Sequence, residues 1–137
     1  MTDTLTGACG CGAVTFAIDA PPVGASYCHC TRCQRRSGTA ASAQIQLARG
    51  SFRVLSGAEQ LAAWKPDPGF EKWFCGACGS ALYSRNPADH DQIAVRMGAL
   101  DQDPGIRPAL RQFVTYAAAW EPIPDDGLPR YPERRPA

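Results

Sequence analysis

The sequence predicts a mostly-β fold built from many short strands. Proline and glycine are abundant, with 12 and 13 residues among 137, which favours turns over long helices. Several short segments alternate apolar and polar side chains, the pattern of a half-buried strand. Seven cysteines fall into tight groups whose spacings are typical of metal-binding loops. Together these features indicate small sheets, joined by turns and held together by metal.

In the first half of the chain, alternation predicts three strands. Residues 14–18 alternate apolar with smaller or polar side chains, and the prolines that follow end this strand because proline donates no ladder hydrogen bond. The next two strands are expected at 42–47 and 52–55, the second closed by a Ser-Gly turn. A short helical turn is expected at 31–36, between the first and second strands.

In the second half, five more segments are expected to be extended. Segment 59–64 is interpreted as a strand, with a helical turn as the alternative, and a Pro/Gly loop follows it. The remaining strands are expected at 70–74, 81–84, 92–98 and 112–118. Residues 120–137 are rich in proline, so they are expected to form an irregular C-terminal arm. We expect this arm to be ordered only where Trp120, Ile123 and Leu128 dock.

Length and charge limit the functional classes. A chain of 137 residues corresponds to one domain, so 1–137 is expected to form a single zinc domain. The formal net charge of +1 creates no strong field for nucleic acid or membrane. The first residues lack the features of a signal peptide, and no apolar run approaches the ~20 residues that span a bilayer. The expected compartment is the cytoplasm, where thiols stay reduced.

Two cysteine pairs are interpreted as one structural zinc site. Cys75 and Cys78 have the spacing of a zinc knuckle, in which both sulfurs reach one ion from a tight turn. Cys9 and Cys11 are less specific, and either can instead be a small buried side chain. Four thiolates would close the site, and such a site contributes on the order of 10 kcal/mol to folding.

The remaining cysteines, Cys28, Cys30 and Cys33, lie within six residues of one another. We interpret them as a catalytic zinc site with a vacant fourth position that is open to a reactant. Three thiolates leave a divalent ion with net negative charge, which makes it a poor Lewis acid toward water but a suitable seat for another soft thiolate. The chemistry favoured is therefore the addition of a thiol to a carbonyl carbon, or its removal.

Neighbours of these three cysteines are candidate substrate contacts. Arg32 and Arg35, together with Arg36, can attract the carboxylates of a small anionic thiol; the alternative for Arg35 and Arg36 is a solvated surface position. His29 lies between two ligands, so in an extended stretch its side chain is expected to point away from the metal. We expect His29 to support or pack behind the site, with a metal ligand or proton shuttle as the alternative.

Other partitions of the cysteines remain open from spacing alone. Cys30 and Cys33 with Cys75 and Cys78 can form a zinc ribbon, which would make the chain a binding module and leave three cysteines without a role. A disulfide framework is disfavoured by the odd number of cysteines. A redox pair at Cys30 and Cys33 is disfavoured because the additional Cys28 favours metal.

The motifs at 7–14, 28–33 and 74–80, with the ending at 120–129, resemble the glutathione-dependent formaldehyde-activating (GFA) family, which also includes centromere protein V. The resemblance implies a β-tent fold of small antiparallel sheets and two zinc ions per chain. It implies a structural zinc on Cys9, Cys11, Cys75 and Cys78, and a catalytic zinc on Cys28, Cys30 and Cys33. The activity implied is that of a carbon–sulfur lyase, which joins formaldehyde and glutathione into S-hydroxymethylglutathione.

The functional expectation is a cytoplasmic zinc enzyme whose partners are a small thiol, glutathione as co-substrate, and an aldehyde such as formaldehyde. The alternative is a non-catalytic zinc module that binds a protein or nucleic acid through Arg32, Arg35 and Arg36. The near-neutral charge counts against nucleic acid.

Overall fold

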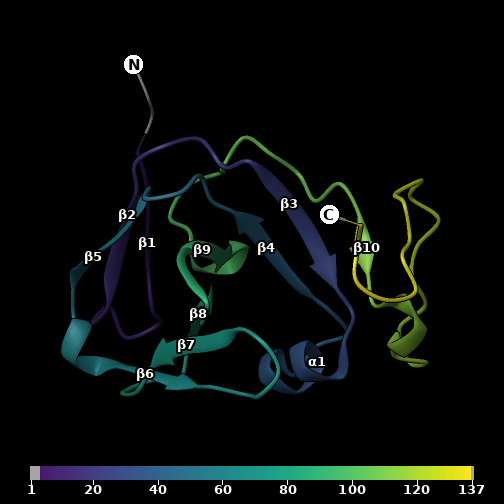
Figure 1. Ribbon diagram of the computed structural model, residues 1–137, viewed down its shortest axis with the longest axis horizontal. Helices are drawn as coiled ribbons and strands as arrows, with labels where there is room; N and C mark the ends of the chain where they lie inside the picture. Colours follow the sequence, from purple (N-terminus) through teal and green to yellow (C-terminus); the bar gives the residue numbers. More distant parts are fainter. Residues whose placement is uncertain (1–3, 137) are drawn as a thin grey trace.

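The structure is a computed structural model that describes residues 4–136. Within this range the chain forms ten strands in two sheets, one short α-helix and three 3₁₀ turns, which confirms the mostly-β prediction. Figure 1 shows the smaller sheet on the left, while the larger sheet extends from β10 on the right to β6 and β7 beneath the smaller sheet, with the helix near the foot of the molecule. No described helix is long and apolar enough to cross a membrane.

The smaller sheet consists of β1 (Leu5–Ala8), β2 (Thr15–Ile18) and β5 (Phe52–Ser56). Both pairings are antiparallel, with β2 in the centre. Gly7 on β1 lies opposite Phe16 on β2, and a Cβ at Gly7 would overlap the Phe16 ring. A glycine is needed there because the aromatic ring of Phe16 is almost fully buried beneath it.

The larger sheet has seven strands in the order β10-β3-β4-β9-β8-β7-β6. The strands are β3 (Gly24–Cys28), β4 (Ser42–Gln46), β6 (Leu61–Trp64), β7 (Glu71–Cys75), β8 (Ala81–Asn86), β9 (Asp89–Arg96) and β10 (Arg111–Gln112). All neighbours are antiparallel except β10, which runs parallel to β3. The sheet is therefore mixed rather than wholly antiparallel.

The core lies where apolar side chains of the two sheets meet. Phe16 and Ile18 of the smaller sheet belong to the same buried cluster as Ile45, Leu82 and Val95 of the larger one. Burying a side chain of this size stabilises the fold by about 1.5–3 kcal/mol. Because both sheets contribute, loss of their contact would expose the whole cluster.

The helix α1 (Thr31–Ser37) begins and ends with clear capping groups. The sulfur of Cys30 accepts a hydrogen bond from the backbone N–H of Cys33 at 3.3 Å, which takes the place of the usual oxygen cap. Gly38 ends the helix in the left-handed conformation, with φ of 69°. Two of the predicted metal ligands therefore also define where the helix starts.

The C-terminal region differs from the prediction in two respects. The strand predicted at 112–118 is wrong beyond Gln112, because Phe113 adopts a left-handed backbone with φ of 58° and a 3₁₀ turn, η3 (Val114–Tyr116), follows. In the arm, Trp120 is 68% exposed and does not dock, whereas Ile123 and Leu128 are half-buried. The arm is held instead by backbone hydrogen bonds to β10 and η3.

Segment 59–64 is divided between two elements. Its first part belongs to a 3₁₀ turn, η1 (Ala58–Gln60), and only the second part is strand β6. A third 3₁₀ turn, η2 (Met97–Ala99), follows β9. Both interpretations of segment 59–64 thus hold for part of it.

Candidate metal centres and the cavity beside them

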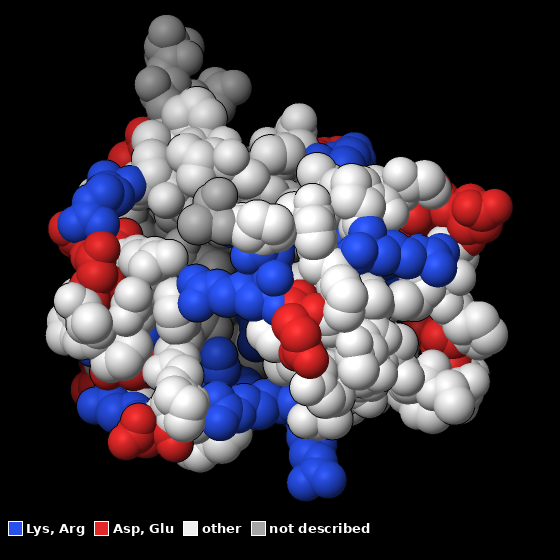
Figure 2. Space-filling view, turned by 45° about the vertical axis from the view of Figure 1, so that its right-hand side comes forward, with Lys and Arg blue, Asp and Glu red and all other residues white. Residues whose placement is uncertain are grey.

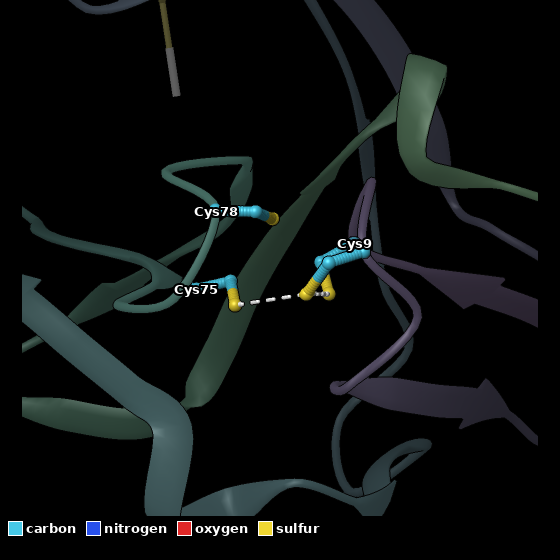
Figure 3. A group of neighbouring side chains, drawn as sticks. Cys9, Cys75 and Cys78 are labelled. Atoms are coloured by element: carbon cyan, nitrogen blue, oxygen red, sulfur yellow. Dashed lines mark hydrogen bonds between the residues drawn. The ribbon is translucent and has the colours of Figure 1, made fainter.

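The first sulfur cluster joins the two sheets. Its four sulfurs all lie within 4.8 Å of one another, and they belong to Cys9, Cys11, Cys75 and Cys78. Figure 3 shows Cys75 and Cys78 reaching from one loop toward Cys9 on the opposite loop. Cys9 and Cys75 are buried, whereas Cys11 and Cys78 are exposed. The cluster therefore lies at the edge of the core and links loops that are distant in sequence.

Tight turns orient the sulfurs of this cluster. The N–H of Val14 donates to the Cys9 sulfur at 3.2 Å, and the N–H of Gly79 donates to the Cys75 carbonyl at 2.7 Å. Gly79 has φ of 82°, a conformation that favours glycine. The two residues between Cys75 and Cys78 thus form the knuckle turn that their spacing predicts.

Ser80 connects the two loops, and the sequence analysis did not single it out. Its hydroxyl lies 3.2 Å from the Cys78 sulfur and accepts a hydrogen bond from the Gly10 N–H at 2.9 Å. The hydrogen bond from Ser80 is the main reason that the pKa of Cys78 is lowered to about 5. A thiol with this pKa is ionised near neutral pH, as a metal ligand must be.

The second sulfur cluster consists of Cys28, Cys30 and Cys33, whose sulfurs also lie within 4.8 Å of one another. Cys28 ends β3, Cys30 caps α1, and Cys33 lies in the first turn of α1. Hydrogen bonding to Cys28 and Cys30 holds the pKa of the Cys33 thiol far below its usual value. The same contacts, with burial, raise the pKa of Cys28.

The composition of both clusters fits zinc. All donors are cysteine sulfurs, which as thiolates suit a soft or borderline metal. The first cluster has the four cysteines of a closed zinc site, and the second has the three cysteines of an open one. The ribbon partition is wrong, because Cys75 and Cys78 lie with Cys9 and Cys11 and not with Cys30 and Cys33.

A cavity of about 700 Å³ borders the three-sulfur cluster, and all three of its cysteines are among the lining residues. Five basic side chains line the same cavity: Arg32, Lys72, Arg96, Arg134 and Arg135. No described Asp or Glu lines it. Figure 2 shows basic side chains gathered around and inside a hollow on one face of the molecule. The cavity is therefore suited to a small anionic ligand that reaches the sulfurs.

The model of the family described as "Glutathione-dependent formaldehyde-activating enzyme" matches residues 4–116, most of the chain. The chain belongs to the GFA family. A Halomonas elongata relative, provisionally named a glutathione-dependent formaldehyde-activating enzyme, is 30% identical over 106 residues, which cover 72% of this chain and 67% of the relative. A Rhodobacter sphaeroides protein of known crystal structure superposes with a TM-score of 0.60 at 22% identity, covering 92% of this chain and 98% of that one. This second likeness supports the fold.

In this GFA family member the three predicted arginines have different surroundings. Arg32 lines the cavity, donates a hydrogen bond to the Pro68 carbonyl at 2.6 Å, and lies 5.9 Å from the centre of the Trp64 ring. Arg35 is exposed and does not line the cavity, so its contact with a thiol substrate stays a prediction. Arg36 lines a second cavity, of about 480 Å³, instead.

The structure adds four basic residues to the site that sequence reasoning missed. Lys72 comes from β7 and Arg96 from β9, while Arg134 and Arg135 come from the C-terminal arm. Burial lowers the pKa of Lys72, which lines the cavity beside the thiolates. These residues carried no local signal, because only the strand order and the path of the arm bring them together.

His29 does not join the sulfur cluster of the GFA family member. It is buried, its N–H donates to the Gln112 carbonyl at 3.0 Å, and its Nε2 lies 3.2 Å from Nη1 of Arg111. Arginine can only donate, so Nε2 accepts and the proton of the neutral ring lies on Nδ1. Burial, and then the charge of Arg111, lower the pKa of His29. The expectation that His29 packs behind the site agrees with this placement.

Proposed function

We propose that this protein is a zinc-dependent carbon–sulfur lyase that joins a small thiol, glutathione, to an aldehyde such as formaldehyde. The observation that carries the proposal is the position of the three-sulfur cluster in the wall of a cavity lined by basic residues. The family of the chain, and the name of its Halomonas elongata relative, support glutathione and formaldehyde as the substrates.

The cysteines would hold two zinc ions with different roles. Cys9, Cys11, Cys75 and Cys78 would hold a structural zinc that joins the two sheets. Cys28, Cys30 and Cys33 would hold the catalytic zinc beside the cavity. A zinc ion bound there supplies a soft Lewis-acid position that keeps a thiol in its nucleophilic, ionised form.

The side chains around the cavity would bind and orient the substrates. Arg32 provides positive charge for the carboxylates of the thiol, and Arg35 is a further candidate on the same helix. Phe70 and Phe113 also line the cavity and add apolar surface beside the charged groups. Holding thiol and aldehyde together raises their effective concentration, which by itself accelerates a bimolecular addition.

The overall reaction needs no oxidant and no leaving group. A C–S bond forms between the thiol sulfur and the carbonyl carbon, and the C=O π electrons move to oxygen. The proton released by the thiol ends on that oxygen, giving the hydroxymethyl thioether. The reverse reaction breaks the same C–S bond, which is why the activity is classed as that of a lyase.

The remaining parts of the proposal concern organisation and location. We propose that 1–137 acts as one zinc domain with 120–137 as its arm, in the cytoplasm, where the thiolates stay reduced. The alternative of a non-catalytic module based on Arg32, Arg35 and Arg36 is less favoured, because these arginines do not share one surface: two of them line different cavities.

The test is the formation of S-hydroxymethylglutathione from glutathione and formaldehyde, followed by NMR with the uncatalysed rate subtracted. We expect Cys30→Ser to lose the catalysed rate by at least ~100-fold, because a ligand of the reactive site is removed. Arg107→Gln, an exposed change outside the cavity, serves as control and should keep the parent rate. A Cys30→Ser protein as active as the parent would refute the mechanism.

A further inference from the structure

The C-terminal arm forms part of the cavity wall. Backbone hydrogen bonds hold it in place: the Phe113 N–H donates to the Glu133 carbonyl at 2.9 Å, and the Tyr131 N–H donates to the Arg111 carbonyl at 2.8 Å. Arg134 and Arg135, which follow Glu133 in the sequence, line the cavity. Both lie beyond residue 116, where the match to the family model ends. This wall of the site therefore belongs to a part of the chain that the family match does not describe.

Gln112 connects the end of the arm to the loop of the sulfur cluster. The side-chain carbonyl of Gln112 accepts a hydrogen bond from the Arg135 N–H at 3.3 Å, and its backbone carbonyl accepts one from the His29 N–H at 3.0 Å. His29 lies between Cys28 and Cys30 in the sequence. This hydrogen-bonded path positions the backbone of Arg135, the neighbour of Arg134, relative to the loop of the sulfurs.

The charge of the cavity is not neutralised by the protein. Within residues 4–136, none of the five basic side chains that line it makes an ion pair. The whole chain has a formal charge of only +1, so this concentration of positive charge is local. Three thiolates with one divalent ion carry one net negative charge and would offset only part of it. A ligand with more than one negative group would neutralise the remaining positive charge.

We propose that Arg134 and Arg135 are specificity-determining residues that bind a carboxylate of the thiol substrate. The inference rests on the proposed function, in that the ligand is taken to be a thiol. The arm thereby selects thiols that carry two carboxylates over neutral thiols of similar reactivity. Guanidinium groups suit this task because they donate paired, charge-assisted hydrogen bonds to a carboxylate.

The binding test uses S-methylglutathione, which retains both carboxylates of glutathione but has no free thiol. Its affinity is measured by titration calorimetry for the zinc-loaded parent, for Arg134→Gln/Arg135→Gln, and for Arg107→Gln. We expect the double variant to bind at least about tenfold more weakly, as expected for lost hydrogen bonds to a charged group. Arg107→Gln should bind like the parent, and Arg134→Lys/Arg135→Lys should recover part of the affinity because it keeps the charge.

The kinetic test compares glutathione with 2-mercaptoethanol, a neutral thiol, in the reaction with formaldehyde. We expect the double variant to raise KM for glutathione at least about tenfold, with kcat and the KM for 2-mercaptoethanol little changed. Equal effects on both thiols, or none on glutathione, would overturn the assignment of these arginines.

The outcomes separate the two proposals. If S-methylglutathione binds in an arginine-dependent way but no C–S bond forms, the carboxylate site stands and the proposed reaction is wrong. If the reaction occurs but the double variant binds and turns over glutathione like the parent, the reaction stands and the role of the arm is wrong. A parent that does not bind S-methylglutathione also overturns the role of the arm.

Discussion

Arg111 connects the loop of His29 to the C-terminal arm. Its Nη1 lies 3.2 Å from Nε2 of His29, while its Nη2 donates to the carboxylate of Asp126 at 2.8 Å. The guanidinium also lies 4.3 Å from the centre of the Tyr27 ring, on the strand that ends at Cys28. One buried side chain therefore joins β3, the sulfur loop and the arm.

We predict that Arg111→Met lowers the free energy of unfolding by about 2–4 kcal/mol, because it removes a buried, hydrogen-bonded cation that holds three segments together. The measurement is denaturant unfolding of the zinc-loaded protein. Arg107→Met is the matched control, since its pairing with Asp103 is exposed and should leave stability unchanged. If both variants unfold at the same denaturant concentration, the role given to Arg111 is wrong.

The cysteine motifs themselves could be predicted, because ligand spacing is a local property of the sequence, but spacing alone also allowed the ribbon, and only the fold brings Cys9 and Cys11 to Cys75 and Cys78. Two strands, β1 and β3, were not predicted. The Gly-Ala-Ser-Tyr-Cys sequence of β3 has small side chains and little strand preference, and it is extended because β4 and β10 pair with it on either side. Conversely, the strand expected at 112–118 stops at Phe113, whose backbone is left-handed. The alternation of apolar and polar residues carries no signal of this backbone conformation.

The residues that line the cavity could likewise be predicted only in part from the sequence. Its cysteines and Arg32 lie in one motif and could be predicted, whereas Lys72, Arg96 and the arm arginines come from separate elements. Their meeting depends on the order of seven strands and on the path of the arm. Hydrogen bonds such as that between His29 and Arg111, 82 residues apart, are likewise a consequence of the fold.

Glu71 should make stability depend on acid pH. Burial by itself raises the pKa of its carboxyl, but hydrogen bonds from Arg85 at 2.7 Å and Trp73 at 3.1 Å outweigh burial and lower the pKa. A carboxyl whose pKa is lower in the folded state stabilises the fold above its unfolded pKa, about 4.3 for Glu. That stabilisation is lost as the pH falls through the lower, folded pKa.

We therefore predict that Glu71→Gln is less stable than the parent at pH 7 by about 1–3 kcal/mol, and that the difference shrinks as the pH falls below about 4.3. Unfolding midpoints measured from pH 7 to pH 3 test this. Glu59→Gln, an exposed change, should follow the parent at every pH. A difference between Glu71→Gln and the parent that stays constant with pH would contradict the assignment.

Gly57 should be far more sensitive to substitution than Gly50. Both have positive φ, 78° and 74°, which disfavours any residue with a Cβ. A Cβ at Gly57 would also overlap the carbonyl of Ala13, beside the first cysteine loop, whereas Gly50 faces open space. We predict that Gly50→Ala costs about 1–2 kcal/mol and Gly57→Ala at least ~3 kcal/mol, measured by thermal or denaturant unfolding. Similar losses in the two variants would show that the contact with Ala13 relaxes freely.

Metal content should distinguish the two sulfur clusters. We predict close to two zinc ions per chain for the parent, because each cluster provides one complete set of thiolates. Cys30→Ser should lose one zinc and keep the fold, since its cluster lies at the cavity and at the start of a short helix. Cys9→Ser should lose the zinc that joins the two sheets, and with it much of the ~10 kcal/mol that such a site adds to folding.

The measurement is zinc per chain by mass spectrometry, together with near-UV circular dichroism to follow tertiary packing. Arg107→Gln, purified in parallel, should contain as much zinc as the parent. Cys9→Ser should lose its near-UV spectrum and Cys30→Ser should keep it, because only the cluster of Cys9 lies between the packed sheets. A parent with one zinc, or a Cys9→Ser protein that stays folded while Cys30→Ser unfolds, would reverse the roles assigned to the two sites.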